Sequence, residues 1–372
     1  MRVTTHPGRG ARGSRENHLA PLRSARSATR GAPFNEPYAS CDREHMDCAP
    51  VARTPTVAVV FRNEMNTTHV RDLFFEAIAE RRFAASIVGV DRVDEAVRDL
   101  ERAHDENLID SEVWSHRLAA LRELLPDGFA ARSLVVIAIP SSEVRVTFQR
   151  GRSVELTMPP TYTEYVSLPT RIAEWAGALL EPHGCAVRPA GQIPLKTLAV
   201  RSGLGDYGRN NICYVPGMGS WAHLVALYTD LEPEGEVWRE PTMLERCASC
   251  RACIRVCPGE AISMERFLIR VERCITWHTE LPAAVALPDW GPKRPPCVFG
   301  CMECQTKCPV NKAVPLRAET GPEFDEHETA RLLAGAPLDD LSEATVQKLR
   351  WLDWIEPYDQ LRRNLEGLLR ES

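Results

Sequence analysis

The positions of the cysteines constrain this chain more than any other feature. Of 13 cysteines in 372 residues, nine fall between Cys247 and Cys308. A disulfide scaffold spreads its cysteines through a short secreted chain, whereas these lie in one part of a long chain that shows no signal-peptide pattern. The distribution therefore favours metal binding in a reducing compartment, and we expect a cytoplasmic protein.

The first half of this segment has an uninterrupted ligand spacing. The run from Cys247 to Pro258 reads C-x-x-C-x-x-C-x-x-x-C-P. In bacterial ferredoxins this spacing directs three thiolates to one 4Fe-4S cluster, while the fourth, here Cys257, binds a second cluster. Zinc sites use separated pairs of ligands instead, so four cysteines in one run argue against zinc.

The second half of the segment supplies further thiolates. Cys301, Cys304 and Cys308 form C-x-x-C-x-x-x-C, followed by Pro309. The remaining ligand is either Cys297 or Cys274, and spacing alone does not decide between them. Two clusters indicate one-electron transfer at low potential.

The rest of the chain predicts an α/β (α+β) fold with a mixed sheet. Residues 1–54 are rich in Arg, Gly, Ser and Pro and are expected to form a disordered tail. Residues 55–240 are expected to form the α/β domain, with strands at 56–61, 85–90, 133–140, 144–148, 154–158, 211–215 and 224–228. Helices are expected between the first two strands and at 93–101, 113–125, 168–180 and 194–202.

Two further parts follow the α/β domain. Residues 241–312 are expected to form a bacterial-ferredoxin-like double 4Fe-4S domain. Residues 313–372 are expected to form a C-terminal segment with short helices at 326–333, 343–352 and 358–369. No run of about 18 apolar residues occurs, so no membrane partner is expected.

A glycine-rich segment precedes the cysteines. Residues 191–221 read GQIPLKTLAVRSGLGDYGRNNICYVPGMGSW. The spacing from Gly203 to Gly208 is G-x-G-x-x-G, but it follows a predicted helix rather than a strand, which argues against a dinucleotide site. The glycines predict a backbone that approaches something flat or bulky closely.

Together, the glycine segment and the cysteines resemble the epoxyqueuosine reductase family. That family carries G-L-G-x-x-G-K-N followed by G-S-W. This chain matches from Gly203 to Asn210, with Arg209 in place of Lys, and again from Gly219 to Trp221. The sequence R-C-I-T at 273–276 and the cysteines from Gly300 onward are also similar, and the resemblance covers residues 131–368.

The resemblance implies cobalamin-dependent reduction that is fed by two 4Fe-4S clusters. It implies one cluster on Cys247, Cys250, Cys253 and Cys308. It implies the other on Cys257, Cys274, Cys301 and Cys304, which leaves Cys297 without a ligand role. The cobalamin would lie against the glycine segment, with contacts from Gly203, Leu204, Gly205, Gly208, Asn210 and Ser220.

The chain departs from the family where a proton donor is needed. Epoxyqueuosine reductases carry a catalytic Asp shortly before the glycine segment, but residues 186–202 contain neither Asp nor Glu. Their G-C-D motif reads Gly300-Cys301-Met302 in this chain. Many members carry C-terminal helical repeats that help to hold tRNA, and here 64 residues follow Cys308. Candidate proton donors are Tyr207, Asp206, Lys196, Tyr162 and Tyr165. His183, His223 and His278 are interpreted as structural.

Three functions remain open at this point. The first is a reductase of an unidentified, perhaps small, substrate. The second is an electron-transfer or reductive-activation protein without substrate chemistry of its own. The third is a tRNA epoxyqueuosine reductase, for which ten Lys and Arg against seven Asp and Glu between Pro241 and Lys312 give a slightly basic segment. Each of them needs a low-potential electron donor such as a flavodoxin or ferredoxin.

Overall fold

The computed structural model describes residues 67–121 and 128–370. The tail expected at 1–54 and the strand expected at 56–61 lie outside these ranges. Every other expected strand is present among the described residues, although one of them is shorter than expected. None of the described helices is long and apolar enough to cross a membrane.

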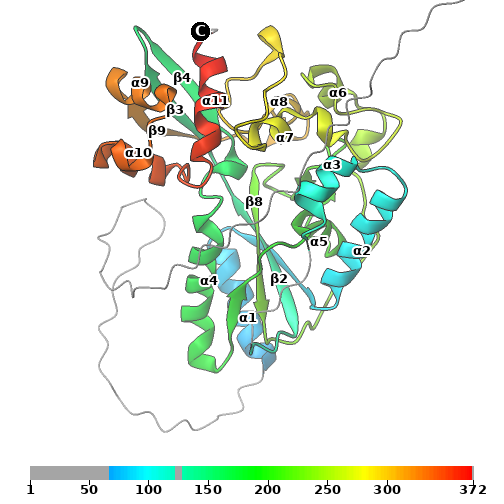
Figure 1. The fold of residues 1–372 in the computed structure, drawn as a ribbon. Helices are drawn as coiled ribbons and strands as arrows, with labels where there is room; N and C mark the ends of the chain where they lie inside the picture. The colour runs from blue at the N-terminus through cyan, green and yellow to red at the C-terminus, as the bar shows by residue number, and fades with distance from the viewer. Residues whose placement is uncertain (1–66, 122–127, 371–372) are drawn as a thin grey trace, which may run out of the picture. The chain divides into compact units, whose positions relative to one another are not determined.

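A four-stranded sheet forms the centre of the N-terminal half (Figure 1). Its order is β1 (Ala84–Gly89), β2 (Ser133–Pro140), β8 (Ala222–Thr229) and β5 (Val187–Pro189), and every pairing is antiparallel. All residues of β2 except the last are buried. The apolar run predicted a strand that is covered on both faces, and this prediction is confirmed. Such strands are typical of parallel sheets, whereas both neighbours of β2 run antiparallel to it.

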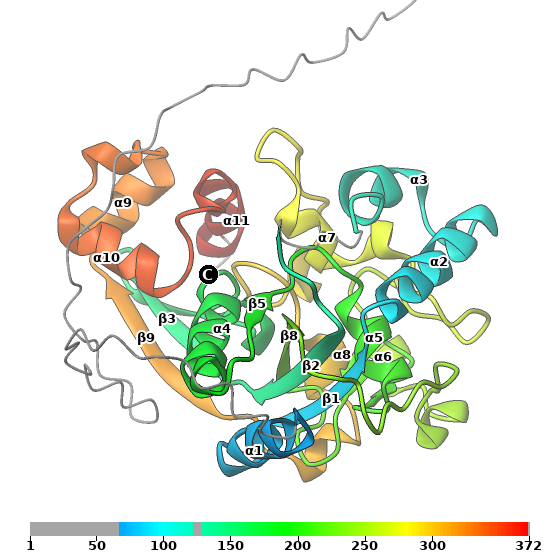
Figure 2. The same cartoon turned by 90° about the horizontal axis from the view of Figure 1, so that it is seen from below.

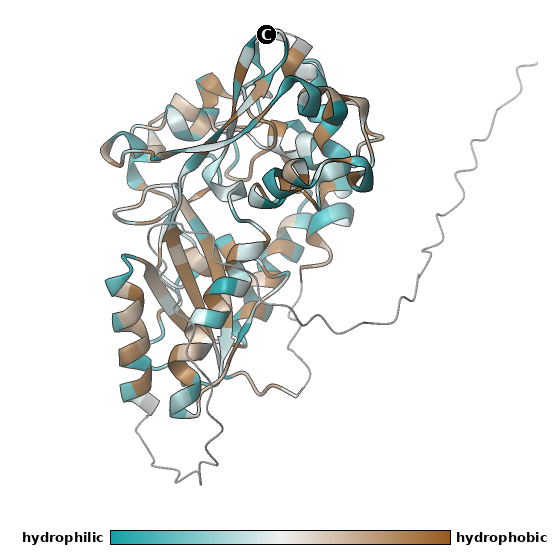
Figure 3. Cartoon of the chain, turned by 90° about the vertical axis from the view of Figure 1, so that its left-hand side faces the viewer, coloured by the Kyte–Doolittle hydropathy of each residue, from teal (hydrophilic) through white to brown (hydrophobic). Residues whose placement is uncertain are grey.

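Helices cover both faces of this sheet, which confirms the α/β class (Figure 2). Helices α1 (Thr67–Glu80) and α4 (Ser167–Leu180) pack on one face. Helices α2 (Arg92–Asp105) and α5 (Leu195–Arg201) lie on the other, where α5 contacts β2 and β8. Figure 3 shows the strands in hydrophobic colours between helices that carry hydrophilic residues on their outer sides. Alternation of side chains along each strand gives both layers an apolar contact surface.

A second, smaller sheet contains the mixed strand pairing. The predicted hairpin is present as β3 (Glu143–Gln149) and β4 (Ser153–Met158). On its other side β3 pairs in parallel with β9 (Ala318–Phe324), which lies after the cysteine segment. The hairpin of the N-terminal half is therefore completed by the C-terminal segment. The sequence did not predict β9, because Gly321 and Pro322 interrupt its pattern.

The C-terminal helices pack on this second sheet. They are α9 (Glu326–Ala334), α10 (Glu343–Trp351) and α11 (Tyr358–Arg370), close to the expected ranges. Asp325 and Glu328 form a capping box that begins α9. The rings of Phe148 and Phe324 stack at 5.0 Å, and Trp354 stacks on Phe148 at 6.4 Å, which joins the two parts of the chain in one core.

The cysteine segment consists of loops and short helices. These are α6 (Ala252–Val256), α7 (Ile275–Glu280) and α8 (Glu303–Thr306), and α6 packs beside α8 (Figure 1).

Two predicted elements are shorter than expected. The helix predicted at 113–125 begins earlier, as α3 (Ser111–Val113), because Asp110 accepts hydrogen bonds from the backbone of Glu112 and Val113. It continues as a single π-helical turn, Trp114–Leu118. The strand predicted at 211–215 is limited to β7 (Cys213–Tyr214), which pairs with β6 (Asp206–Tyr207).

Candidate functional site

Four cysteines influence one another at the first half of the segment. Burial raises the pKa of the Cys247 thiol, and the charges of Cys308 and Cys250 raise it further. Burial raises the pKa of Cys253 to about 11, again with contributions from Cys247, Cys250 and Cys308. These four are the residues that the resemblance assigns to one cluster, and we call them the first group.

The other four predicted ligands form a second group. Burial raises the pKa of Cys274, and the Cys257 charge adds to this effect. Burial raises the pKa of Cys304 to about 12, with contributions from Cys274, Cys257 and Cys253. Burial also raises the pKa of Cys301, followed by the charges of Cys304 and Cys274. Because Cys253 of the first group also acts on Cys304, these effects show that the cysteines lie near one another, and the two ligand sets stay a prediction.

Cys297 lies outside both groups. It is buried against Trp221 and Met302. Burial raises its pKa to about 12, and the Glu303 charge adds to this effect. Cys297 in turn contributes to the raised pKa of Cys301. These surroundings support a packing role for Cys297.

The chemistry of the two groups fits iron–sulfur clusters. Buried thiols with raised pKa values become thiolates only where a metal charge compensates them. Within the described ranges, no three His, Cys, Asp or Glu side chains have the geometry of a site for one ion. Ligands of a single ion converge on that ion, whereas the four cysteines of a 4Fe-4S cluster bind four different irons.

The glycines of residues 203–221 press on the chain's own backbone. A Cβ at Gly205 would lie 2.6 Å from the Tyr214 carbonyl oxygen, and one at Gly208 would lie 2.4 Å from the Tyr214 ring. Gly203 has a φ of +77° at the end of α5, and Gly219 has a φ of +62° beside Asn311. The close approach that the sequence predicts is confirmed, and at Gly205 and Gly208 its partner is β7.

Two other predicted cofactor contacts also serve internal packing. Leu204 is buried in the core of the large sheet. Ser220 donates a hydrogen bond to Gln305 (2.9 Å) and accepts one from Asn311 (2.7 Å). These bonds connect the end of the glycine segment to the loop around the last cysteines.

Asn210 and Tyr214 lie near one cysteine of each group. The Asn210 amide donates to the Tyr214 hydroxyl (3.1 Å). Burial is the largest cause of the raised pKa values of Cys304 and Tyr214; the Asn210 side chain opposes the rise at Cys304, and Cys308 adds to the rise at Tyr214. We call this hydrogen-bonded pair the Asn210–Tyr214 bridge. Beside it, the Arg209 guanidinium donates to the Cys247 carbonyl (2.9 Å).

Two of the candidate proton donors have structural partners. Asp206 accepts a hydrogen bond from Arg239 (2.7 Å) and another from Thr242. The Tyr207 hydroxyl bonds Thr197 (3.2 Å), and burial raises the pKa of Tyr207 to about 12. Both residues therefore hold β6 in place.

The other candidates gather near Cys274. Burial raises the pKa of Tyr162 well above its usual value, and the charges of Glu280 and Cys274 add to the effect. Burial lowers the pKa of Lys196, which the Cys213 and Cys274 charges partly oppose. Lys196 is nevertheless exposed, and its ammonium donates to the carbonyl and the side chain of Asn211 (both 3.0 Å).

Glu280 is a functional candidate that the sequence analysis missed. It accepts a hydrogen bond from the Tyr162 hydroxyl, and Arg117 lies 3.6 Å from its carboxylate. Burial raises the pKa of Glu280, although both partners oppose the rise. The sequence shows only a single acidic residue at the end of the short stretch 275–280, and nothing local marks it as a proton donor.

Lys196 and Tyr165 are exposed, whereas Tyr162 and Glu280 are half-buried. Burial nevertheless raises the pKa of Tyr165, and the Glu280 charge adds to this effect. The His223 ring lies 6.1 Å from that of Tyr165. Burial lowers the pKa of His223 to about 4, and its Nδ1 has no hydrogen-bond partner among the described residues.

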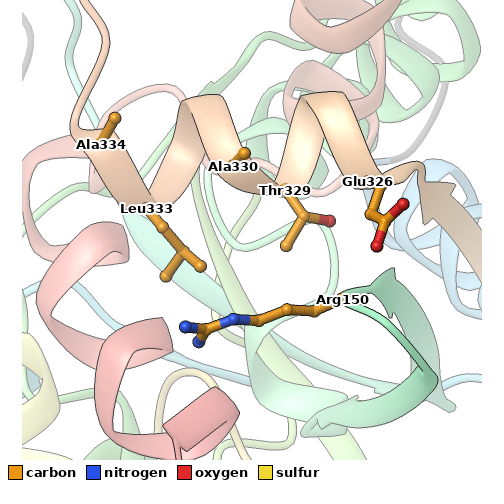
Figure 4. A pocket seen from close by; sticks show the side chains of 6 residues that line it. All are labelled: Arg150, Glu326, Thr329, Ala330, Leu333 and Ala334. Atoms are coloured by element: carbon orange, nitrogen blue, oxygen red, sulfur yellow. The ribbon is translucent and has the colours of Figure 1, made fainter.

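A pocket of about 460 Å³ lies elsewhere, between the hairpin and α9 (Figure 4). Arg150 lies below α9, and the Glu326 carboxylate accepts a hydrogen bond from the Gly151 backbone (2.8 Å). The pocket contains no cysteine. Its lining gives no reason to connect it with the cysteine groups.

Comparison with protein families identifies the cysteine segment. Residues 246–311 match the family described as "4Fe-4S double cluster binding domain". The match includes both cysteine groups. The chain therefore carries a double 4Fe-4S segment.

Relatives of known name match a larger part of the chain. An epoxyqueuosine reductase of Shewanella oneidensis is 34% identical over 126 residues, which are 34% of this chain and 30% of the relative. One of Synechocystis sp. is 30% identical over 192 residues, 49% of this chain and 59% of the relative. The chain thus spans less than two thirds of the length of either relative.

A solved structure extends the likeness to the fold. It is an epoxyqueuosine reductase with an epoxyqueuosine-modified tRNA stem loop. It matches with a TM-score of 0.55 and 19% identity, and the match covers 82% of each chain. The chain is therefore similar in sequence and in fold to the epoxyqueuosine reductases.

Proposed function

We propose that this chain is an iron–sulfur oxidoreductase that delivers electrons through two 4Fe-4S clusters to a cobalamin beside Cys274, where Lys196, Tyr162, Tyr165 and Glu280 would form a recess, the Cys274 recess. The observation that carries the proposal is the match of residues 246–311, with all eight of these cysteines, to the double-cluster family. The first group would bind one cluster and the second group the other. Cobalamin, when bound, supplies the low-potential cobalt centre that reduces the substrate.

Residues 55–240 would hold the cobalamin and residues 241–312 the clusters. The recess fits a large polar ligand, because exposed Lys196 and Tyr165 offer hydrogen-bonding groups. The unpaired Nδ1 of His223 adds a buried polar atom at its edge. Gly205 and Gly208 would shape this side of the recess through β7 instead of touching the ligand themselves.

The pair Tyr162 and Glu280 would supply the proton that the missing Asp supplies in the family. The Tyr162 hydroxyl already points its proton toward a carboxylate. Burial raises the pKa of Glu280, so that the carboxyl can hold a proton at a higher pH than an exposed one. Arg117, 3.6 Å away, would stabilise the carboxylate once the proton has left.

Two readings of the substrate follow from the relatives. The tRNA reading is supported by the likeness to the solved reductase that carries a tRNA stem loop. The small-molecule reading is supported by a tetrachloroethene reductive dehalogenase of Desulfitobacterium hafniense, 24% identical over 65% of this chain. The absence of a carboxylate between residues 186 and 202 favours a substrate other than epoxyqueuosine. Either reaction would take its electrons from a flavodoxin or ferredoxin.

The test is the cofactor content of anaerobically reconstituted chain. We expect about eight irons and eight sulfides per chain, and one corrinoid with a perturbed Co(II) EPR signal. Full iron loading without corrinoid affinity would favour an electron-transfer or reductive-activation protein. Turnover of a tRNA stem loop that contains epoxyqueuosine would identify the tRNA reaction.

A further inference from the structure

The loops around the first cysteine group carry exposed positive charges. A basic residue directly adjoins three of the four cysteines in the sequence, and another lies two positions after the remaining one. All of these basic side chains are exposed. They are Arg246, Arg251, Arg255 and Lys307.

These cations have no charged partner in the described part of the chain. None of the four forms an ion pair with another described residue. Arg201, by contrast, is buried and forms an ion pair with Asp99 (2.6 Å). Unpaired exposed cations remain available to a partner of opposite charge.

The short helices bring these charges to one side of the segment. Arg255 lies in α6 and Arg251 directly precedes it, while Lys307 directly follows α8. Helix α6 packs beside α8 (Figure 1). Arg246 lies in the turn that contains Cys247, whose pKa responds to the Cys308 charge. The four cations therefore surround the first group.

Two thiols of the first group lie close to the surface. Cys250 and Cys253 are half-buried, and the exposed Arg251 directly follows Cys250 in the sequence. Electron transfer weakens steeply with distance, so a donor docked on these loops would have a short path to the first group.

An apolar spot accompanies the charges. Met264 and Phe267 are 37% and 36% exposed in the loop after α6, and the Phe267 ring packs on Tyr207 at 5.1 Å. Exposed Glu260 and Glu265 lie in the same loop. A surface with an apolar centre and a charged rim is typical of a protein interface.

We infer that this surface, which we call the donor face (Arg246, Arg251, Arg255, Phe267 and Lys307), binds an acidic low-potential electron-transfer protein that reduces the first cluster. The inference rests on the proposed function, because it requires a cluster on the first group. Each encounter oxidises the donor protein by one electron and reduces the first cluster by one electron, and no covalent bond forms or breaks. A two-electron reduction takes two encounters, with the Asn210–Tyr214 bridge lying between the two clusters.

The experiment uses the full reconstituted chain and a reduced acidic flavodoxin. Stopped-flow absorbance follows the bleaching of the clusters at low and high salt. For the wild type we expect a bimolecular rate that falls steeply with ionic strength. The double variant Arg251→Glu/Arg255→Glu should be at least tenfold slower at low salt and nearly insensitive to salt. Arg246→Glu/Lys307→Glu gives an independent second variant.

Three controls separate docking from damage. Iron content and reduction by dithionite, which needs no docking surface, should match the wild type in both variants. Arg152→Glu, an exposed cation at the hairpin turn, should leave the flavodoxin rate unchanged. A wild-type rate in both charge-reversal variants overturns the inference. So does loss of tRNA stem-loop affinity in variants that keep the flavodoxin rate. A wild-type chain that binds no cluster overturns the proposed function and this inference with it.

Discussion

Replacement of Tyr214 by Phe tests the Asn210–Tyr214 bridge. The substitution keeps the buried ring and removes the hydroxyl that accepts a hydrogen bond from Asn210 (3.1 Å) and whose pKa Cys308 helps to raise. We expect this hydroxyl to donate to the Cys308 thiolate when the cluster is bound. A reduced cluster carries one more negative charge than an oxidised one, so a hydrogen-bond donor stabilises the reduced state more. Removal of the donor should therefore lower the reduction potential of the first cluster.

The size of the shift follows from the strength of one hydrogen bond. A bond to a charged acceptor contributes about 1.5–3 kcal/mol, and a thiolate accepts it in both redox states, so about 1 kcal/mol distinguishes them. For a one-electron couple this corresponds to a potential roughly 40 mV more negative. The second cluster, which keeps Asn210 near Cys304, should shift much less.

The assay is a potentiometric titration followed by EPR. Tyr207→Phe is the matched control, because Tyr207 is equally buried and its hydroxyl bonds Thr197 instead of a cysteine. An unchanged potential in Tyr214→Phe with full iron content would refute the reasoning. An equal shift in both variants would refute it as well, because the effect would then be one of packing.

Three further predictions concern packing, pH and ligands. Gly205→Ala should lower the free energy of unfolding by about 1–3 kcal/mol, because the added Cβ would lie 2.6 Å from a backbone oxygen. Gly191→Ala is the control, because the space around Gly191 is open and its stability should not change. Thermal unfolding measures the stability of both variants. His223 is held neutral with a pKa of about 4, while the unfolded chain binds a proton below pH 6.5. The stability from this residue is therefore complete above pH 6.5 and lost as pH falls toward 4, by up to about 1.4 kcal/mol per pH unit. His223→Asn should remove that slope in denaturant unfolding at pH 5 and 7, and equal slopes would contradict the assignment. Cys274→Ser should lower iron to about four per chain, whereas Cys297→Ser should keep about eight, and the opposite result would exchange their roles.

Local patterns allowed much of the fold to be predicted from sequence. The apolar run at 133–140 forms β2 with the expected bounds. It could be predicted because a strand that is buried on both faces consists of consecutive apolar residues. Strand β9 was missed because its stability comes from pairing with β3, far away in the chain, and not from its own composition. The close approach at Gly205 was predicted, but its partner β7 was not.

The same distinction applies to the site. The cysteine spacing predicted the two clusters, because most ligands of a ferredoxin-type cluster lie within a few residues of one another in the sequence. It left Cys274 and Cys297 as alternatives, and their surroundings in the fold support Cys274. Glu280 was missed because its role arises from Tyr162, which lies 118 residues earlier in the sequence.

The parallel pairing of β3 with β9 has a consequence for how the protein is made. Gln149 and Glu323, 174 residues apart, form a hydrogen bond (2.6 Å) across these strands, and the whole cysteine segment lies between them. During synthesis the hairpin leaves the ribosome long before its partner strand exists, so its edge stays open while the cysteines emerge. Cluster assembly would then occur on an incompletely folded chain, and closure of the small sheet would come afterwards. A ferredoxin folds as an independent domain. Here the cluster segment lies in the sequence between two strands, β3 and β9, that pair in one sheet.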